Sequence, residues 1–450
     1  MNGGATLFAE TQAPGKGSAC QFLVHVATGV VCEATSIIDD APQIRGETVL
    51  LLGNYRVSIV IARQLGRAGY SVIVGGGTDS VVARCRYVES VWDHPSLFKN
   101  SKAFLAALDE LLEQRPDISV ILPVAEPSLL RLVKLSQQLP IPLAAVDRAN
   151  VELCCDKGRM VELAAELEVP QAPCAVANNM AELVEVIEQI GYPCVARPND
   201  GRNYEVKAYF IEDHADFLRM FPEWPRGHKS LLVQAHAYGP RYNRYFVADQ
   251  GVILDSLDVR IVRTDRSDGS GYAVEGVSMA PVPEMDEPSR KLLEHLQYTG
   301  VGCVQFLLDE RTRQLSFLEI NPRIGGNYSF AQRCGLDLVT PLLNLAQDRP
   351  LGETAAPGTH DLGKRYQWLY GDLIGLLGSI YKREIGVVEA VSWFFKSGRA
   401  LVRADAHLTW DRDDPGPTKW FARRLVEAAL VILWDLARYV RRRIKSVLRL

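Results

Sequence analysis

The chain of 450 residues lacks several features that would assign a function at once. No stretch reaches the roughly 20 apolar residues of a membrane-spanning helix, because residues 421–440 contain five charged side chains. No basic excess is present, since 50 Lys and Arg stand against 54 Asp and Glu, which argues against a nucleic-acid partner. The nine cysteines include no CxxC pair, which favours reduced thiols over a metal or disulfide framework. We therefore expect a cytoplasmic protein.

The first apolar segment also lacks the common phosphate-binding signatures. Residues 47–77 show the order strand, turn, helix and strand, which is typical of a βαβ unit opening a parallel sheet. The turn contains neither a full GxGxxG fingerprint nor a P-loop, so dinucleotide binding is not indicated. Gly75 to Gly77 is interpreted as a permissive turn. The alternation continues to about residue 148 and predicts an α/β domain over 47–148.

The length of the chain predicts two or three domains, because a single core rarely extends over 450 residues. Residues 1–46 contain Glu10, Lys16 and several Gly and Pro, which interrupt the apolar core that a secretory signal requires. We expect these residues to form a flexible leader.

A set of polar residues stands out in the stretch VQFLLDERTRQLSFLEINPRIGG, residues 304–326. Its two ends alternate as strands do, and the charged segment between them suits a hairpin loop. A loop centred near Thr312 places Gln305 opposite Glu319, and the period of two puts Asn321 on the same face. The expected strands are residues 304–308 and 315–320.

These side chains have the chemistry of a magnesium site. Opposed residues in such a pair have Cβ atoms about 4.5 to 5.5 Å apart, so one cation can contact both. Gln305, Glu319 and Asn321 offer oxygen ligands to Mg²⁺, which usually completes its shell with water and substrate phosphates. Arg323 adds a planar fork suited to phosphate or carboxylate. The alternative interpretation is the solvated face of an amphipathic hairpin.

Gln305 and the string Glu319-Ile320-Asn321-Pro322-Arg323 resemble the metal and phosphate signature of the ATP-grasp superfamily, in particular the large subunit of carbamoyl phosphate synthetase. The resemblance implies a Rossmann-like pre-ATP-grasp α/β domain followed by an ATP-grasp fold over 149–349. It implies ATP and Mg²⁺ as cofactors, with two ions expected and Mn²⁺ as an alternative. Gln305, Glu319 and Asn321 are then the metal ligands, and Arg323 is a catalytic residue.

The same resemblance assigns residues to the nucleotide. Lys157, in a "DK, helix, VP" pattern, and Arg197 match the positions of cations that contact the phosphates, with Lys207 as a further candidate in the lid, about 190–236. Solvent-exposed roles for Lys157 and Arg197 are the alternatives. The hinge strand that recognises adenine through its backbone corresponds to Gln234, Ala235, His236 and Ala237.

Two departures from the family pattern are visible. The lid loop has only Gly201 where many relatives have several glycines, and the hinge lacks the usual ribose-binding Glu, for which Asn243 is the candidate substitute. Further along, Arg260 and Arg263 precede a Gly-rich loop at 269–271. Related ligases bind the carboxylate substrate with a basic residue in this region, so Arg260 is a second catalytic candidate, and a solvated turn is the alternative.

The C-terminal region, 350–450, is expected to be helical. Its terminal helix, 418–450, has an apolar stripe and a basic end. Two interpretations stay open: packing on the domain or on a second copy of the chain, with the basic end suited to a helix C-terminus, or contact with an anionic membrane at the inner face. The basic side chains are Arg438, Arg441, Arg442, Arg443, Lys445 and Arg449.

The function implied by the resemblance is ATP-dependent ligation. A small carboxylate would be activated as an acyl phosphate and then attacked by an amine or a similar nucleophile. Carbamoyl phosphate synthesis itself is disfavoured, because that enzyme duplicates the ATP-grasp unit and this chain shows one copy. The alternative is a nucleotide-binding sensor or scaffold that has kept the fold and lost turnover.

Overall fold

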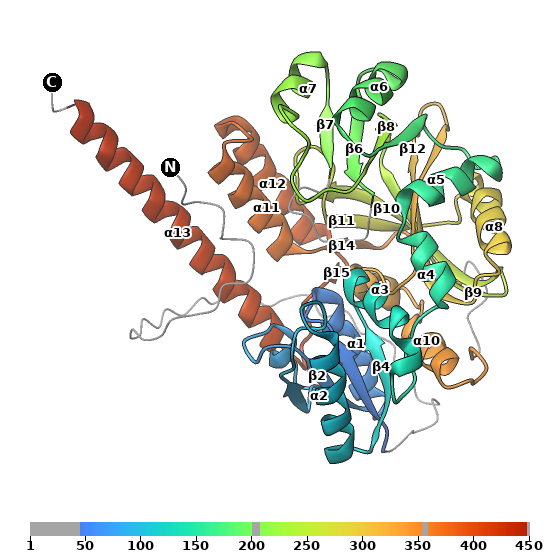
Figure 1. Ribbon diagram of the computed structural model, residues 1–450. Helices are drawn as coiled ribbons and strands as arrows, with labels where there is room; N and C mark the ends of the chain where they lie inside the picture. Colours follow the sequence, from blue (N-terminus) through green and yellow to red (C-terminus); the bar gives the residue numbers. More distant parts are fainter. Residues whose placement is uncertain (1–45, 200–207, 353–358, 448–450) are drawn as a thin grey trace. The chain divides into compact units, whose positions relative to one another are not determined.

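The computed structural model describes residues 46–199, 208–352 and 359–447, and these residues contain three β-sheets (Figure 1). Residues 1–45 of the predicted leader lie outside the described residues, and so does Lys207 in the lid loop. Residues 43–450 cluster as one compact unit, so the boundaries predicted at 148 and 349 stay predictions.

The first sheet is parallel, with strand order β3-β2-β1-β4. The predicted βαβ opening is confirmed, because β1 and β2 pair in parallel on either side of α1. In β1, Val49 and Leu51 pack with α1, whereas Leu50 and Leu52 pack with α2 and α3. A strand covered on both faces needs such a continuous apolar run. The elements are β1 (Thr48–Leu52), α1 (Arg56–Arg67), β2 (Ser71–Gly75), β3 (Ser90–Trp92), α2 (Ser101–Gln114), β4 (Ile118–Pro123) and α3 (Glu126–Lys134).

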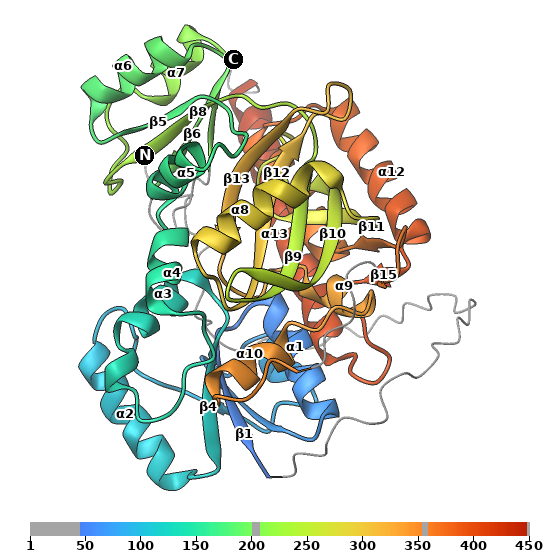
Figure 2. The same cartoon turned by 90° about the vertical axis from the view of Figure 1, so that its right-hand side faces the viewer.

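The second sheet has seven strands in the order β13-β12-β9-β10-β11-β14-β15, antiparallel except for the β14–β15 pair. One face packs through Tyr242, Phe246 and Phe306 against α4, α5 and α8; Figure 2 shows α8 over this face. The other face packs against α9 and α10. The elements are α8 (Asp286–His295), β9 (Arg241–Asp249), β10 (Val252–Thr264), β11 (Ala273–Met279), β12 (Gly300–Leu308), β13 (Leu315–Asn321), α9 (Tyr328–Arg333), α10 (Val339–Ala346), β14 (Arg365–Gln367) and β15 (Ala406–His407).

The third sheet is antiparallel, with strand order β5-β8-β6-β7, and α6 and α7 pack on it through Leu183, Phe217 and Phe221 (Figure 1). It includes β5 and α6, which precede the predicted lid at 190–236. Two helices, α4 and α5, come before it in the chain. The elements are α4 (Arg148–Cys154), α5 (Lys157–Glu166), β5 (Cys174–Ala177), α6 (Met180–Ile190), β6 (Cys194–Pro198), β7 (Tyr209–Ile211), α7 (His214–Met220) and β8 (Leu231–Ala235).

The helical character predicted for the C-terminal region is confirmed in the described residues by α11 (Leu369–Lys382), α12 (Val387–Arg403) and α13 (Gly416–Val447). Phe421 near the start of α13 packs against Tyr370 of α11 in a tilted arrangement, with 4.5 Å between the ring centroids. None of the described helices combines the length and the apolar character that crossing a bilayer requires. The seven cysteines in the described ranges are all free thiols, as predicted.

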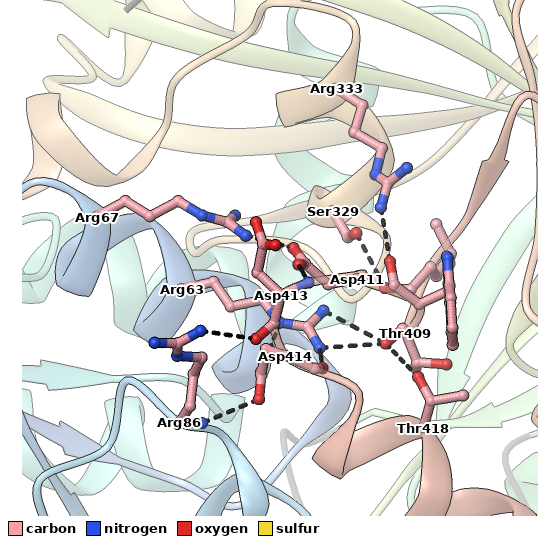
Figure 3. Close-up of polar contacts among 12 residues, drawn as sticks. Arg63, Arg67, Arg86, Ser329, Arg333, Thr409, Asp411, Asp413, Asp414 and Thr418 are labelled. Carbon is pink, nitrogen blue, oxygen red and sulfur yellow. Dashed lines mark hydrogen bonds and ion pairs between the residues drawn. The ribbon is translucent and has the colours of Figure 1, made fainter. Parts of the chain in front are cut away.

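The segment 408–415, between β15 and α13, is held on α1 by a buried ion pair (Figure 3). The Arg63 Nε donates to Asp414 at 2.8 Å, and both side chains are less than 5% exposed. The Asp414 carboxylate also accepts the backbone N–H of Arg86 at 2.9 Å. Two outer contacts flank this pair: Arg67 with Asp411 at 2.6 Å and Arg333 with the Trp410 carbonyl at 2.7 Å.

We predict that Asp414→Ala destabilises the fold by about 3–5 kcal/mol, because it leaves the Arg63 guanidinium buried without its carboxylate. Asp411→Ala is the matched control: Arg67 is 44% exposed, so this change should cost about 0–1 kcal/mol. Urea unfolding of both variants measures the difference. Equal free energies of unfolding for the two variants would contradict the prediction.

Candidate functional site

The predicted hairpin is present, and its polar residues form a row across three strands. Gln305 in β12 pairs with Glu319 in β13, as the sequence predicts, and on its other side with Asn243 in β9. Asn321 follows two residues after Glu319, on the same face. A register shift separates Gln305 from Phe306, so the next pair is Phe306 with Phe317. The hairpin therefore presents polar oxygens on one face and aromatic core residues on the other.

Glu319 is the electrostatic centre of this row. Its carboxylate lies 3.7 Å from the Lys157 ammonium. Burial by itself would raise the pKa of Glu319, but the nearby cations Lys157, Arg197 and Arg241 and the Asn321 amide together lower it to about 2. The carboxylate is therefore ionised throughout the neutral pH range, as a metal ligand must be.

Asn321 and Arg323 extend the cluster toward the first sheet. The Asn321 side-chain N–H donates to Glu319 at 3.0 Å, and the Arg323 guanidinium donates to the Asn321 side-chain oxygen, Oδ1, at 3.3 Å. Arg323 also lies 3.8 Å from Glu126, the first residue of α3. Its Nε is buried and has no hydrogen-bond partner among the described residues. The structure thus brings the metal candidates and the catalytic candidate Arg323 together.

Lys157 is positioned by the start of α5. It is the first residue of that helix, and Asp156 caps the helix by accepting the Arg159 N–H at 3.1 Å. Asn199, just after β6, accepts the backbone N–H of Lys157 at 3.2 Å and that of Gly158 at 2.5 Å. A Cβ at Gly158 would lie 2.8 Å from Val176, so only glycine allows this close approach.

Arg197 and Gln234 come from neighbouring strands of the third sheet. The Arg197 guanidinium donates to the Gln234 side-chain oxygen at 3.1 Å. Burial lowers the pKa of Arg197, and Glu319 opposes that shift. The Arg197 Nε and the Gln234 amide nitrogen are buried and find no partner in the part of the chain that the structure describes. Buried donors without acceptors are costly, which favours an acceptor-rich ligand between this sheet and Glu319.

The hinge residues Ala235 and His236 use their backbone N–H groups within the protein. Ala235 donates to the Pro173 carbonyl at 2.8 Å and His236 to the Pro193 carbonyl at 3.0 Å. The carbonyl groups of these residues and the backbone of Ala237 are what the predicted adenine contact would have to use. That contact stays a prediction.

Arg260 is not part of this cluster. It pairs with Tyr242 in β9, whereas Gln305 pairs with the next residue of that strand, Asn243. Because successive side chains of a strand point to opposite faces, Arg260 lies on the face opposite to Gln305. There it donates to Glu310. Its catalytic role, predicted from proximity in sequence, therefore has no geometric support, because strand parity turns it away from Glu319.

Three further residues near the site are placed by their strand partners or contacts. Arg263 is held by Glu275 and Asp372, both at 2.6 Å. Asn243, the candidate ribose ligand, lies opposite Gln305, a place that favours contact with metal or phosphate. Arg241 was not predicted, although it precedes Asn243 by two residues in the same strand and acts on the Glu319 charge. The period of two could have identified it.

The chain has recognisable relatives. The model of the carbamoyl-phosphate synthase L chain, ATP binding domain, matches residues 275–354, which include β12 and β13. The carbamoyl phosphate synthase large chain of Thermomicrobium roseum is 26% identical over 226 residues, covering 48% of this chain. The matched region is only 21% of that much longer relative.

Solved structures agree on the fold. The ADP complex of N5-carboxyaminoimidazole ribonucleotide synthetase superposes with a TM-score of 0.56 at 14% identity, covering 71% of this chain and 80% of that one. The L-amino acid ligase from Bacillus licheniformis gives 0.54 at 15% identity, covering 69% and 78%. The family model, the curated relatives and the solved structures together support the ATP-grasp superfamily for this chain. Its ATP-grasp fold has the mixed α/β content that the sequence predicts; the Rossmann-like description of the first sheet stays a prediction.

Magnesium fits the donor set of this ATP-grasp site only together with a polyanion. Glu319 supplies an ionised carboxylate, and Gln305 and Asn321 supply amide oxygens, all hard ligands. In the described ranges no three His, Cys, Asp or Glu side chains gather as a metal site. One carboxylate with three nearby cations is a weak magnesium site by itself, so the phosphates must provide the remaining ligands.

Proposed function

We propose that the chain is an ATP- and magnesium-dependent ligase that activates a small carboxylate as an acyl phosphate for attack by an amine or a similar nucleophile. The supporting observation is the ionised Glu319 among Lys157, Arg197 and Arg241, beside the amides of Gln305 and Asn321. Such a set combines a metal ligand with cations that can neutralise a triphosphate.

Each residue has a definable part in this chemistry. Lys157 and Arg197 would bind the phosphates, while Gln305, Glu319 and Asn321 would hold Mg²⁺ against them. Bound magnesium would supply neutralisation of the negative charge that develops during transfer. Arg323, with its unpaired buried Nε, would orient the substrate carboxylate toward the γ-phosphorus. The carboxylate oxygen then forms a bond to phosphorus, ADP leaves, and the nucleophile displaces phosphate from the acyl group.

We predict that Glu319→Ala weakens magnesium-dependent binding of ATP at least about tenfold, because it removes the only carboxylate of the metal set and leaves several cations uncompensated. Isothermal titration with MgATP measures the affinity, and ADP release with a panel of carboxylates and amines measures turnover. Glu287→Gln, which alters an exposed acid of α8, is the matched control.

Unchanged MgATP affinity in Glu319→Ala would refute the proposed site. Tight MgATP binding by the native protein, without ADP release for any pair of substrates, would instead favour the alternative of a nucleotide sensor or scaffold.

We also propose a membrane contact, and the observation that favours it lies on α12 rather than on α13 alone. The buried face of α12 consists of Trp393, Ser397 and Ala400. On the remaining surface Val388 is 83%, Phe395 70% and Val402 86% exposed. Exposed basic residues accompany this apolar face: Lys396, Arg399 and Arg403. Apolar side chains with flanking cations suit an anionic lipid surface.

We predict that the protein co-sediments with vesicles containing phosphatidylglycerol more strongly than with pure phosphatidylcholine, and that Phe395→Glu reduces this binding, because a charge enters the apolar face. Equal sedimentation of both proteins would exclude the contact. If Phe395→Glu instead abolishes a concentration-dependent dimer in sedimentation velocity, the face binds a second copy and the membrane proposal is wrong.

A further inference from the structure

A second cationic centre adjoins the Glu319 row and is built on Arg56, the first residue of α1. Its Nε donates to the Gly326 carbonyl at 3.0 Å, and one terminal nitrogen donates to the Asn327 side chain at 2.5 Å. The guanidinium lies 3.8 Å from the centre of the Trp368 ring, a cation–π contact. The other terminal nitrogen is buried and, among the described residues, has no hydrogen-bond partner. Two distant segments, one at Gly326 and Asn327 and one at Trp368, thus fix this arginine while leaving one donor unused.

Arg241 is the second member of this centre. It pairs with Leu307, two residues from the Asn243–Gln305 pair, and so shares their face of the sheet. Within residues 46–199, 208–352 and 359–447, its terminal nitrogens reach only the Gly271 carbonyl, at 3.4 Å, and its buried Nε has no partner. The Gly271 carbonyl that Arg241 contacts is followed by Tyr272, whose ring centroid lies 6.4 Å from that of Trp368, the ring that Arg56 contacts. Both arginines also act electrostatically on Tyr245 and Tyr366. The two guanidinium groups therefore share one neighbourhood.

This neighbourhood contains more buried hydrogen-bond donors than acceptors available to them. Besides the two arginine nitrogens, the Trp368 indole N–H is buried and has no acceptor among the described residues. Asn327 is engaged at both ends of its amide, because its oxygen accepts from Arg56 and its NH₂ group donates to the Tyr366 hydroxyl at 2.6 Å. Within the described residues, neither Arg56 nor Arg241 has a carboxylate within 4 Å.

The nearest acid that acts on Arg56 is Asp265, and it is occupied elsewhere. Its carboxylate accepts the backbone N–H of Tyr272 at 2.8 Å, which closes the turn between β10 and β11. Burial lowers the pKa of Arg56 to about 10, so the guanidinium remains charged at neutral pH without a close counter-ion. Partly buried cations that carry buried, unpaired donor atoms call for an acceptor from outside the chain.

We propose that Arg56, Arg241 and the Trp368 N–H bind an oxyanion, a carboxylate or a phosphate group, carried by a substrate of this protein. Arg241 connects the two centres, since it lies beside the Asn243–Gln305 row and acts on Glu319. The oxyanion is therefore held next to the site assigned to the triphosphate. The identification of the ligand as a substrate rests on the proposed ligase function; the anion site itself does not.

The test titrates the thermal unfolding midpoint with malonate and, separately, with inorganic phosphate, each at constant ionic strength kept with sodium chloride. A ligand that binds the native state raises the midpoint in a saturable way. We expect saturation with at least one of the two anions, and the anion that saturates identifies the group as carboxylate or phosphate. Arg56→Gln and Arg241→Gln should each raise its dissociation constant about 10- to 100-fold, as loss of a charged hydrogen bond does.

Control variants keep the outcome unambiguous. Arg423→Gln removes an exposed arginine of α13 and should titrate like the native protein. Arg56 also supports the fold through Gly326 and Asn327, so Arg56→Gln can be unstable. In that case the result rests on Arg241→Gln, which loses only contacts of 3.4 Å. Glu319→Gln should lose MgATP affinity and keep the anion response, which separates this inference from the proposed function. Native-like titration of both arginine variants, or no saturation with either anion, would overturn it.

Discussion

The ion cluster around Glu319 is the interaction on which the arrangement of the candidate site depends. A buried carboxylate is unfavourable by itself, and here Lys157, Arg197 and Arg241 reverse that penalty and keep it ionised. The three cations come from α5, β6 and β9, so the charge of one side chain ties a helix and two sheets to the same point. Magnesium and a triphosphate would enter an arrangement that is already charged and oriented, which lowers the reorganisation that phosphoryl transfer requires.

The sequence predicted what depends on local period and missed what depends on distant contacts. The Gln305–Glu319 pairing followed from alternation and loop length, and the βαβ opening followed from its apolar runs. Arg260 was chosen for its place near a Gly-rich loop, but strand parity puts it with Glu310 on the other face. No local pattern could bring Arg56 to Trp368, which lies 312 positions away in the sequence. Lys207 lies outside the described residues.

The C-terminal region contributes to the site as well as to the surface. The Arg63–Asp414 pair holds the segment 408–415 on α1, the helix whose first residue is Arg56. Trp368, which immediately precedes α11, stacks on that same arginine. Trp368 therefore links the proposed oxyanion site to α11. The helix with the exposed apolar and basic face, α12, follows α11 in the chain, so the membrane contact proposed for α12 and the oxyanion site are supported by the same segment.

Locating a bound metal ion is the most direct test of the proposed role of Glu319. A crystal grown with Mn²⁺ and a non-hydrolysable ATP analogue would reveal the ion by anomalous scattering. We expect the anomalous peak of Mn²⁺ about 2.1 Å from the Glu319 carboxylate, between this carboxylate and the terminal phosphates of the nucleotide. The Arg197 guanidinium should contact the phosphate oxygens. A metal and triphosphate bound elsewhere, with Glu319 still paired only to Lys157, would contradict this role.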